Sequence, residues 1–265
     1  MNRTNSRDTL TFTLRSMFVA AAIALLSAAP AHAGGWRFHL TPYAWATDMG
    51  VDVKLDGRQV VDKDIRVTDL LEDLDTIFQA RLEVTNGSFG VMTDVFDVTL
   101  SDEAKGVALP QGAGTADVSS KIGMTILDVA GTFDPNADRQ GFGFVLGTRI
   151  LDERAEIDAT LMPAPGVSVP QSHDEDDTMV DALAGVRFSK RFSTSWGVQM
   201  QADASTGGTD YTWSLNPSLT YAFGRFGRYG LNAGYRVMKF DFKDEAGANT
   251  QMTLSGALLG FRISF

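Results

Sequence analysis

The sequence has no cysteine, and its 265 residues include three histidines. Without cysteine the chain can form neither a disulfide framework nor a thiolate metal site. The shortage of histidine leaves few side chains that act as general bases near neutral pH. We therefore expect no cofactor, no metal centre and no enzymatic activity.

The sequence also lacks a long apolar run. A helix needs about 20 apolar residues to cross a bilayer. One shorter run, Phe18–Ala29, follows basic residues and precedes the small-residue pattern Ala31-His32-Ala33. This order is typical of a cleaved export signal. We interpret residues 1–33 as a signal peptide and residues 34–265 as a single mature domain.

Basic residues are scarce in the mature domain. Removal of residues 1–33 takes away three Arg and one Asp, which leaves 20 basic and 32 acidic residues and moves the net charge from −10 to −12. A protein that binds nucleic acid needs clustered Lys and Arg on one face. No such cluster is visible, so nucleic acid is excluded as a partner.

Period-two alternation is the clearest pattern that is present. In residues 210–223 the large apolar side chains occupy odd positions from Tyr211 to Phe223, and small polar side chains occupy even positions from Thr212 to Thr220. Alternation of this kind places the two sets on opposite faces of a strand. Soluble sheets alternate as well, so strand length has to decide the environment.

Many of the alternating segments exceed the five or six residues usual for soluble sheets and reach the roughly ten residues that a tilted membrane crossing needs. We therefore predict an all-β fold, an up-and-down antiparallel transmembrane β-barrel of about ten strands. Eight or twelve strands are alternatives, because residues 51–55 and 59–67 are also consistent with an extra hairpin. The ten predicted strands are residues 36–47, 75–87, 88–101, 117–133, 141–154, 177–190, 193–205, 210–223, 228–241 and 250–265.

The predicted connections alternate between short and long, as in membrane barrels with tight periplasmic turns and longer outer loops. Within the first outer segment, Leu70, Leu71 and Leu74 have helical spacing, and a short helix over residues 67–74 would cap the outer mouth. Pro42 and Pro217 fall inside predicted strands, where we expect bulges. The tight connections are residues 86–87, 135–140, 189–192 and 224–227, and the outer ones are residues 48–74, 102–116, 155–176, 206–209 and 242–249.

Aromatic residues crowd near the tight connections, as in the interfacial girdle of a membrane barrel. The chain resembles Gram-negative outer-membrane barrels whose last strand ends in Phe, here Phe261, Ile263 and Phe265. In that superfamily the terminal pattern is the signal read by the barrel-assembly machinery. The chain also resembles a poorly characterised group whose first strand carries the pattern of Thr41-Pro42-Tyr43-Ala44-Trp45. The resemblance implies a bacterial outer-membrane location and a lipid environment, and it transfers no catalytic residue.

Charges of both signs fall on the face opposite the apolar one. Isolated buried ions are costly, so these side chains must pair or line a wet channel. Four of the arginines follow a glycine two positions earlier, and we interpret each glycine as making room in the lumen for a guanidinium. The predicted lumen charge network is Arg81, Glu83, Asp94, Asp128, Arg149, Arg187, Asp203, Arg236 and Arg262, with Arg37 and His39 on the same face.

Three functions are compatible with this arrangement. A narrow barrel filled by paired charges would be a closed structural or surface-binding protein. A constricted, charge-lined lumen would be a diffusion channel for small solutes. An outer-membrane hydrolase is disfavoured, because Ser172, His173 and Asp174 are adjacent, whereas a catalytic triad converges from separate segments.

The predicted outer loops are acidic. Asp174–Asp177 and the group Glu72, Asp73 and Asp75 offer the oxygen ligands that hard cations prefer, so a loop-bound divalent cation is one interpretation. The simpler interpretation is solvated charge facing lipopolysaccharide, which is itself anionic and bridged by cations.

Overall fold

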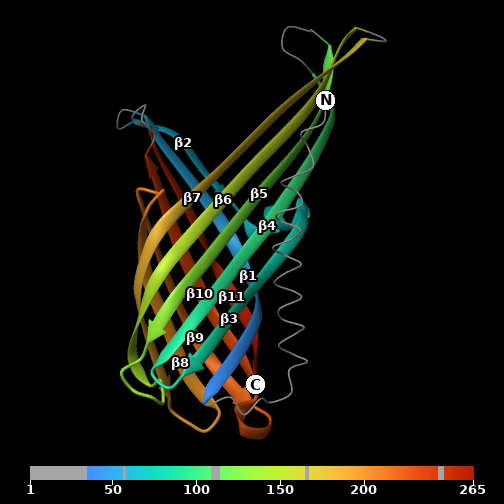
Figure 1. The fold of residues 1–265 in the computed structure, drawn as a ribbon. Coiled ribbons are helices and arrows are strands. Elements are labelled where there is room, and N and C mark those ends of the chain that lie inside the picture. Colours follow the sequence, from blue (N-terminus) through green and yellow to red (C-terminus); the bar gives the residue numbers. More distant parts are fainter. Residues whose placement is uncertain (1–34, 56–57, 109–113, 165–166, 244–247) are drawn as a thin grey trace.

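The computed structural model describes residues 35–55, 58–108, 114–164, 167–243 and 248–265, so the predicted signal peptide lies outside the described residues. Strands dominate this part of the chain (Figure 1). No helix in the described ranges combines the length and hydrophobicity needed to cross a membrane. The strands are β1 (Trp36–Leu55), β2 (Arg58–Ile65), β3 (Leu74–Asn86), β4 (Phe89–Ala108), β5 (Thr115–Phe133), β6 (Gly141–Ala164), β7 (Val167–Arg191), β8 (Trp196–Gly207), β9 (Tyr211–Phe223), β10 (Tyr229–Lys243) and β11 (Ala248–Ser264).

Each strand from β3 to β11 pairs with its sequence neighbour, and β1 pairs with both β3 and β11. The described residues therefore form a closed antiparallel barrel of ten strands, β1 and β3–β11. Closure is completed at the chain end, where Phe38 and Phe265 exchange two backbone hydrogen bonds of 3.3 and 3.0 Å. The predicted fold and the predicted strand number are confirmed.

The barrel has two different ends. At one, which we call the turn end, short connections join β3–β4, β5–β6, β7–β8 and β9–β10. At the other, the hairpin end, β4–β7 continue well beyond the remaining strands as a projecting sheet (Figure 1). The prediction of outer loops at residues 102–116 and 155–176 was wrong for most of these residues. They continue the ladder, with Glu103 opposite Ser119 and Glu156 opposite Asp174.

The segment between β1 and β3 contains the extra hairpin and the short helix. Strand β2 pairs with Met49–Leu55, the outer part of β1. Helix α2 (Val67–Glu72) follows, and its first backbone N–H, on Val67, donates to Asp48 Oδ1 at 2.7 Å. The predicted bulges at the prolines are absent. Pairing is skipped near Pro42 and Pro217 on one side, but the register continues unchanged.

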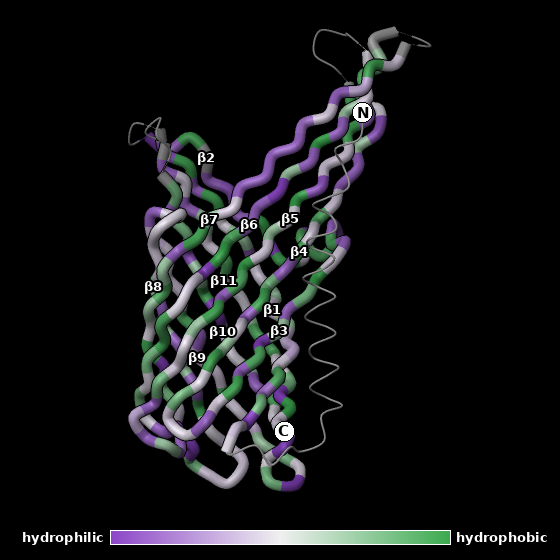
Figure 2. Tube along the Cα trace, viewed as in Figure 1, coloured by the Kyte–Doolittle hydropathy of each residue, from purple (hydrophilic) through white to green (hydrophobic). Residues whose placement is uncertain are grey.

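Side chains alternate sharply between the outside and the inside of the barrel. Leu146 is 73% exposed, whereas the next inward residue, Val145, is 2% exposed. In β4, Val91 faces outward, and Met92, Asp94 and Phe96 face inward. Figure 2 shows this mixture of hydrophobic and hydrophilic residues along every barrel strand.

Aromatic side chains form cross-strand pairs near the turn end. Ring centroids lie 5.0 Å apart for Phe89 and Phe133, and 4.8 Å apart for Trp196 and Tyr221. Pairs of this kind contribute about 0.5–1.5 kcal/mol beyond their burial. They link successive strands at one level around the wall, as an interfacial girdle requires.

Glycines allow neighbouring strands to approach closely. A Cβ on Gly256 would lie 1.7 Å from the Ala46 carbonyl oxygen, and one on Gly147 would lie 2.2 Å from the Val129 carbonyl oxygen. The Gly-x-Arg pattern thus has a different basis at Gly147, where the glycine accommodates a neighbouring backbone rather than a guanidinium. At Gly256 the approach lies in the seam that closes the barrel.

We predict that Gly256→Ala destabilises the barrel by about 1–3 kcal/mol, because the added methyl group overpacks the β1–β11 seam. Gly123→Ala is the matched control, since its Cβ would meet no atom closer than 3.8 Å. The measurement is the urea midpoint of the refolded proteins, followed by the heat-dependent gel mobility of the barrel. Equal midpoints for the two variants would contradict the close approach.

Candidate functional site

The barrel interior holds a central ion layer, and one half of it is built around Arg149. This side chain is 1% exposed and donates from Nε and Nη2 to the two carboxylate oxygens of Asp128, at 2.7 and 2.8 Å. Its Nη2 also donates to Asp203 Oδ1 at 2.9 Å. Register explains the geometry, because β5–β6 pairing sets Asp128 directly opposite Arg149. Ser214 and Gln201 donate to Asp203 as well, so that carboxylate has several partners.

The other half of the central ion layer is built around Asp94. Arg81, its cross-strand neighbour, donates to Asp94 Oδ2 at 2.6 Å. The Tyr43 hydroxyl donates to Asp94 Oδ1 at 2.8 Å, and Arg236 Nη1 lies 3.5 Å from Oδ2. The Arg236 guanidinium also lies over the Trp45 ring, with Cζ 4.8 Å from the ring centroid. Desolvated contacts of these kinds offset the cost of burying charge.

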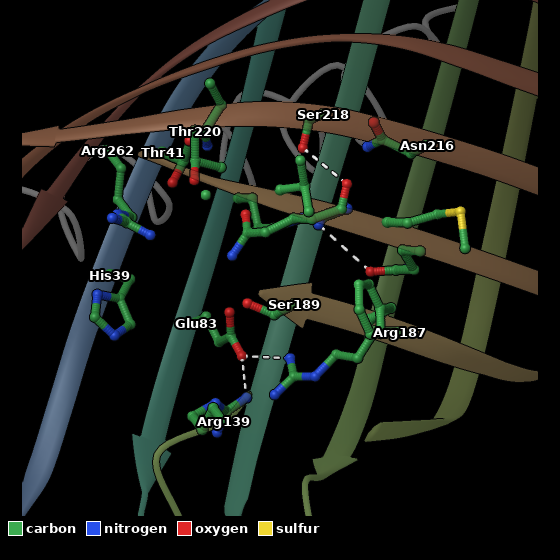
Figure 3. A pocket seen from close by; sticks show the side chains of 18 of the residues that line it. His39, Thr41, Glu83, Arg139, Arg187, Ser189, Asn216, Ser218, Thr220 and Arg262 are labelled. Atoms are coloured by element: carbon green, nitrogen blue, oxygen red, sulfur yellow. Dashed lines mark hydrogen bonds and ion pairs between the residues drawn. The ribbon is translucent and has the colours of Figure 1, made fainter. Parts of the chain in front are cut away.

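A second group, the turn-end cluster, combines Glu83, Asp134, Arg139 and Arg187. Glu83 Oε1 accepts from Arg139 at 2.5 Å and from Arg187 at 2.6 Å (Figure 3). Asp134 pairs with the same two arginines. Arg139 lies in the 134–140 connection and adopts a φ of 57°, so this connection folds its guanidinium into the lumen.

Asp134 and Arg139 were not among the predicted lumen residues, because Asp134 follows the predicted strand 117–133 and Arg139 falls in the predicted tight connection 135–140. Asp134 could have been found. It continues the inward parity of Asp128, Ala130 and Thr132 one step past the end of β5. Arg139 could not have been found this way, since its orientation depends on a left-handed backbone outside any strand.

Toward the hairpin end, the interior becomes apolar. This apolar layer follows the ions along the strands, for instance at Leu151 after Arg149 and at Met238 and Phe240 after Arg236. The sequence predicted a polar inner face throughout, and the structure differs here because a closed lumen excludes water and favours apolar packing. The buried members of the layer are Trp45, Phe96, Met124, Ile126, Leu151, Met238, Phe240, Met252 and Leu254.

A polar cavity of about 300 Å³ lies beside the turn-end cluster. Arg262 and His39 line it from β11 and β1, across from Glu83 and Arg187 (Figure 3). His39 Nδ1 lies 2.9 Å from Ser264 Oγ. Within the described residues, Arg262 is the one member of the predicted network that forms no ion pair, and its Nε is buried without a hydrogen-bond partner. The cavity is of a size and polarity suited to ordered water.

The structure thus brings the nine predicted lumen residues to one interior but divides them among three places. Asp128, Arg149 and Asp203 contact one another, and Arg81, Asp94 and Arg236 form the second half of the central ion layer. Glu83 and Arg187 belong to the turn-end cluster, and Arg262 lines the cavity.

The predicted assembly signal lies on the strand that closes the barrel. Phe261 stacks on Tyr229 with ring centroids 6.0 Å apart. Ile263 is paired with Leu40 on one side and Tyr229 on the other. The third residue, Phe265, makes the backbone contacts with Phe38 described above.

Among the described residues, the acidic side chains predicted as cation ligands do not converge on one point, and the two histidines of the mature domain lie apart. Asp174–Asp177 lie along β7 rather than in a loop, paired with residues of β6. The described residues contain no group of three His, Asp or Glu placed to hold a metal ion. Ser172, His173 and Asp174 are consecutive in one extended strand, so their side chains alternate between its faces. His39 lies in the lumen, whereas His173 lies on the projecting sheet.

No protein-family model and no curated protein matches the sequence. Among solved structures, the translocator domain of the autotransporter NalP from Neisseria meningitidis is 11% identical, covers 96% of this chain and 97% of its own, and has a TM-score of 0.42. The attachment invasion locus protein Ail of Yersinia pestis, solved with a heparin analogue, is 12% identical. That match covers 88% of this chain and 99% of Ail, and its TM-score is 0.38. The outer membrane protease OmpT from Escherichia coli is 8% identical. That match covers 89% of this chain and 99% of OmpT, and its TM-score is 0.40. At these identities and TM-scores, the likenesses say nothing about the activity of this chain. The barrel fold is defined by the strand pairing of the described residues.

We predict that Asp128→Ala destabilises the barrel by about 3–5 kcal/mol, because it leaves the buried Arg149 guanidinium without its bidentate partner. The control is Asp174→Ala on the exposed part of β7, expected to change stability by less than about 0.5 kcal/mol. Urea midpoints of the two variants and the unmodified protein give the comparison. A similar midpoint for both variants would show that Asp128 is not a buried partner.

Proposed function

We propose that the mature chain is an integral protein of the bacterial outer membrane, in which a closed, non-enzymatic barrel carries an acidic binding surface outside the cell. The outer wall supports the membrane location. Large apolar side chains such as Leu146, Phe144 and Leu259 are more than half exposed on it, which suits a hydrocarbon environment. In water the same surface would be an aggregation hazard.

The two ends of the barrel support an orientation. Tight turns and aromatic pairs occur together at the turn end, which fits the periplasmic interface. The projecting sheet would then lie outside the cell. Partners of the proposed protein are the lipid and lipopolysaccharide around it, and the barrel-assembly machinery that reads Phe261, Ile263 and Phe265 during insertion.

One observation carries the proposal of a closed lumen. The bidentate Arg149–Asp128 pair and the apolar layer follow one another along the same strands, and both are buried. An ion crossing the barrel would have to break the ion pair and then lose its hydration water on entering the apolar layer. Each step is unfavourable. The diffusion channel is therefore the weaker alternative.

The projecting sheet supports the binding role. Hydrophilic residues dominate its part of β6 and β7 (Figure 2). Glu153 is opposite Asp177 and Glu156 is opposite Asp174, so acidic side chains meet across the two strands. Repulsion between them favours a cationic partner, such as the divalent cations that bridge lipopolysaccharide or a basic surface. The separation of His39 from His173 supports the non-enzymatic part of the proposal.

We predict that the purified protein produces no stable single-channel steps in a planar lipid bilayer, because the central ion layer and the apolar layer block the lumen. An open porin prepared in the same detergent is the positive control for insertion. Heat-dependent gel mobility confirms that the inserted sample is folded. Reproducible conductance steps from the folded protein would contradict the closed lumen and favour the diffusion channel.

A further inference from the structure

The polar cavity beside the turn-end cluster has a charge balance opposite to that of the whole chain. The chain has 33 acidic and 23 basic residues, whereas four acidic and eight basic residues line the cavity. The uncharged side chains of Asn216, Ser218 and Thr220 line it from β9 (Figure 3). An acidic protein that gathers cationic side chains around one concave site creates a positive potential there.

Three of the cationic side chains lack a counter-ion within the described part of the chain. Arg37 of β1, Arg191 of β7 and Arg262 of β11 line the cavity but form no ion pair. Arg37 and Arg262 both act electrostatically on His39, and Arg191 acts on Arg262 from across the lumen. The three unpaired arginines therefore lie close enough to repel one another.

The four acidic residues of the lining have other partners. Glu83, Asp94 and Asp134 are each shared by two of the arginines described above. Asp138 lies in the turn and accepts from the Gln140 backbone N–H at 3.1 Å. These carboxylates are thus engaged elsewhere, and the charge of the three unpaired arginines is not compensated. Uncompensated charge in a confined, partly dry site is unfavourable.

The arginines can be reached from outside the barrel. Gly230 is the cross-strand neighbour of Arg262, and a Cβ on it would lie 3.1 Å from Arg262 Nη2, so the glycine makes room for the guanidinium. Arg262 Nε is buried, but Nη1 and Nη2 are not, and they form no hydrogen bond with any residue that the structure describes. Arg37 and Arg191 are exposed near the turn-end limits of β1 and β7, so the cavity opens at the turn end.

We infer that the cavity is a binding site for a phosphate group, held by Arg37, Arg191 and Arg262 and entered from the turn end. A phosphate group carries nearly two negative charges near neutral pH and offers several acceptor oxygens. Guanidinium groups match its geometry, and the hydroxyl groups of Ser218 and Thr220 supply further donors.

The size of the cavity limits the ligand. A volume of about 300 Å³ is at the lower end of small-molecule pockets, so the ligand is either inorganic phosphate or a small phosphate monoester. A simple carboxylate brings one charge and two oxygens and should bind more weakly. The site depends on the barrel interior alone, so it goes beyond the proposed function, and its failure would leave the closed lumen and the membrane location standing.

The test is equilibrium dialysis of the full mature protein, folded in a nonionic detergent, at low ionic strength and near neutral pH. Radiolabelled inorganic phosphate and radiolabelled glycerol phosphate are the two probes, and acetate is the competitor that serves as the monovalent control. We expect saturable binding of phosphate at one site per chain, with little displacement by acetate. Tighter binding of glycerol phosphate identifies a monoester as the ligand, and tighter binding of inorganic phosphate identifies the free ion.

Charge variants test the three arginines. Arg262→Gln and Arg191→Gln should each weaken phosphate binding by at least about tenfold, because each removes a charge-assisted contact. Arg225→Gln is the matched control, since Arg225 is exposed at the same end but does not line the cavity, and it should leave the affinity unchanged. Heat-dependent gel mobility reports whether each variant is folded. Arg191 is exposed, so its variant tests the site even if Arg262→Gln does not fold.

A blocking variant separates a site inside the cavity from general attraction to the turn end. Ser218→Leu fills part of the cavity, keeps every charge and should abolish saturable binding. Binding that is insensitive to Ser218→Leu, or that weakens equally in Arg191→Gln and Arg225→Gln, would overturn the site. The same conclusion would follow if neither phosphate probe bound saturably, or if acetate displaced phosphate at equal concentration.

Discussion

The closed hydrogen-bond ladder is the constraint on which the rest of the molecule depends. Because every barrel strand has a neighbour on both sides over most of its length, alternate side chains must face either the outside or a narrow interior. The outside can then be apolar, as at Leu146, only if it meets lipid. The inside can hold Arg149 only if its charge is matched within the protein. The paired charges are thus a consequence of closure.

The same constraint explains which features could be predicted from the sequence. Strand number and inward or outward orientation depend on local period-two patterns, and the predicted inner face contains Asp128 and Arg149, which contact each other in the interior. Contacts across the lumen depend on barrel circumference and strand tilt, which no local pattern encodes. The approach of Tyr43 and Arg236 to Asp94 belongs to this second kind. The projecting sheet was missed because the acidic residues of β6 and β7 alternate poorly and resemble a solvated loop.

The interior combines two ways of excluding water, and their order along the barrel is informative. Ion pairs predominate from the turn end to the middle, and apolar packing predominates toward the hairpin end. Over residues 43–48, all of which the structure describes, β1 pairs with neither β2 nor β3, and this break in the wall lies beside the apolar layer. Pro42, which has no backbone N–H, ends the β1–β3 pairing at the lower margin of this break.

In the proposed membrane arrangement, consecutive residues of each strand face lipid and a dry interior in turn, and single nitroxide labels on β7 test this alternation most directly. The absence of cysteine allows labels at Ala182, Leu183, Ala184 and Val186 in turn, each in protein reconstituted into lipid vesicles. The measurement is the accessibility of each label to oxygen, which dissolves in lipid, and to a water-soluble nickel chelate. We predict high oxygen accessibility at 182, 184 and 186, and low accessibility to both reagents at 183. Access of the nickel chelate to position 183, or oxygen accessibility without alternation, would contradict the account.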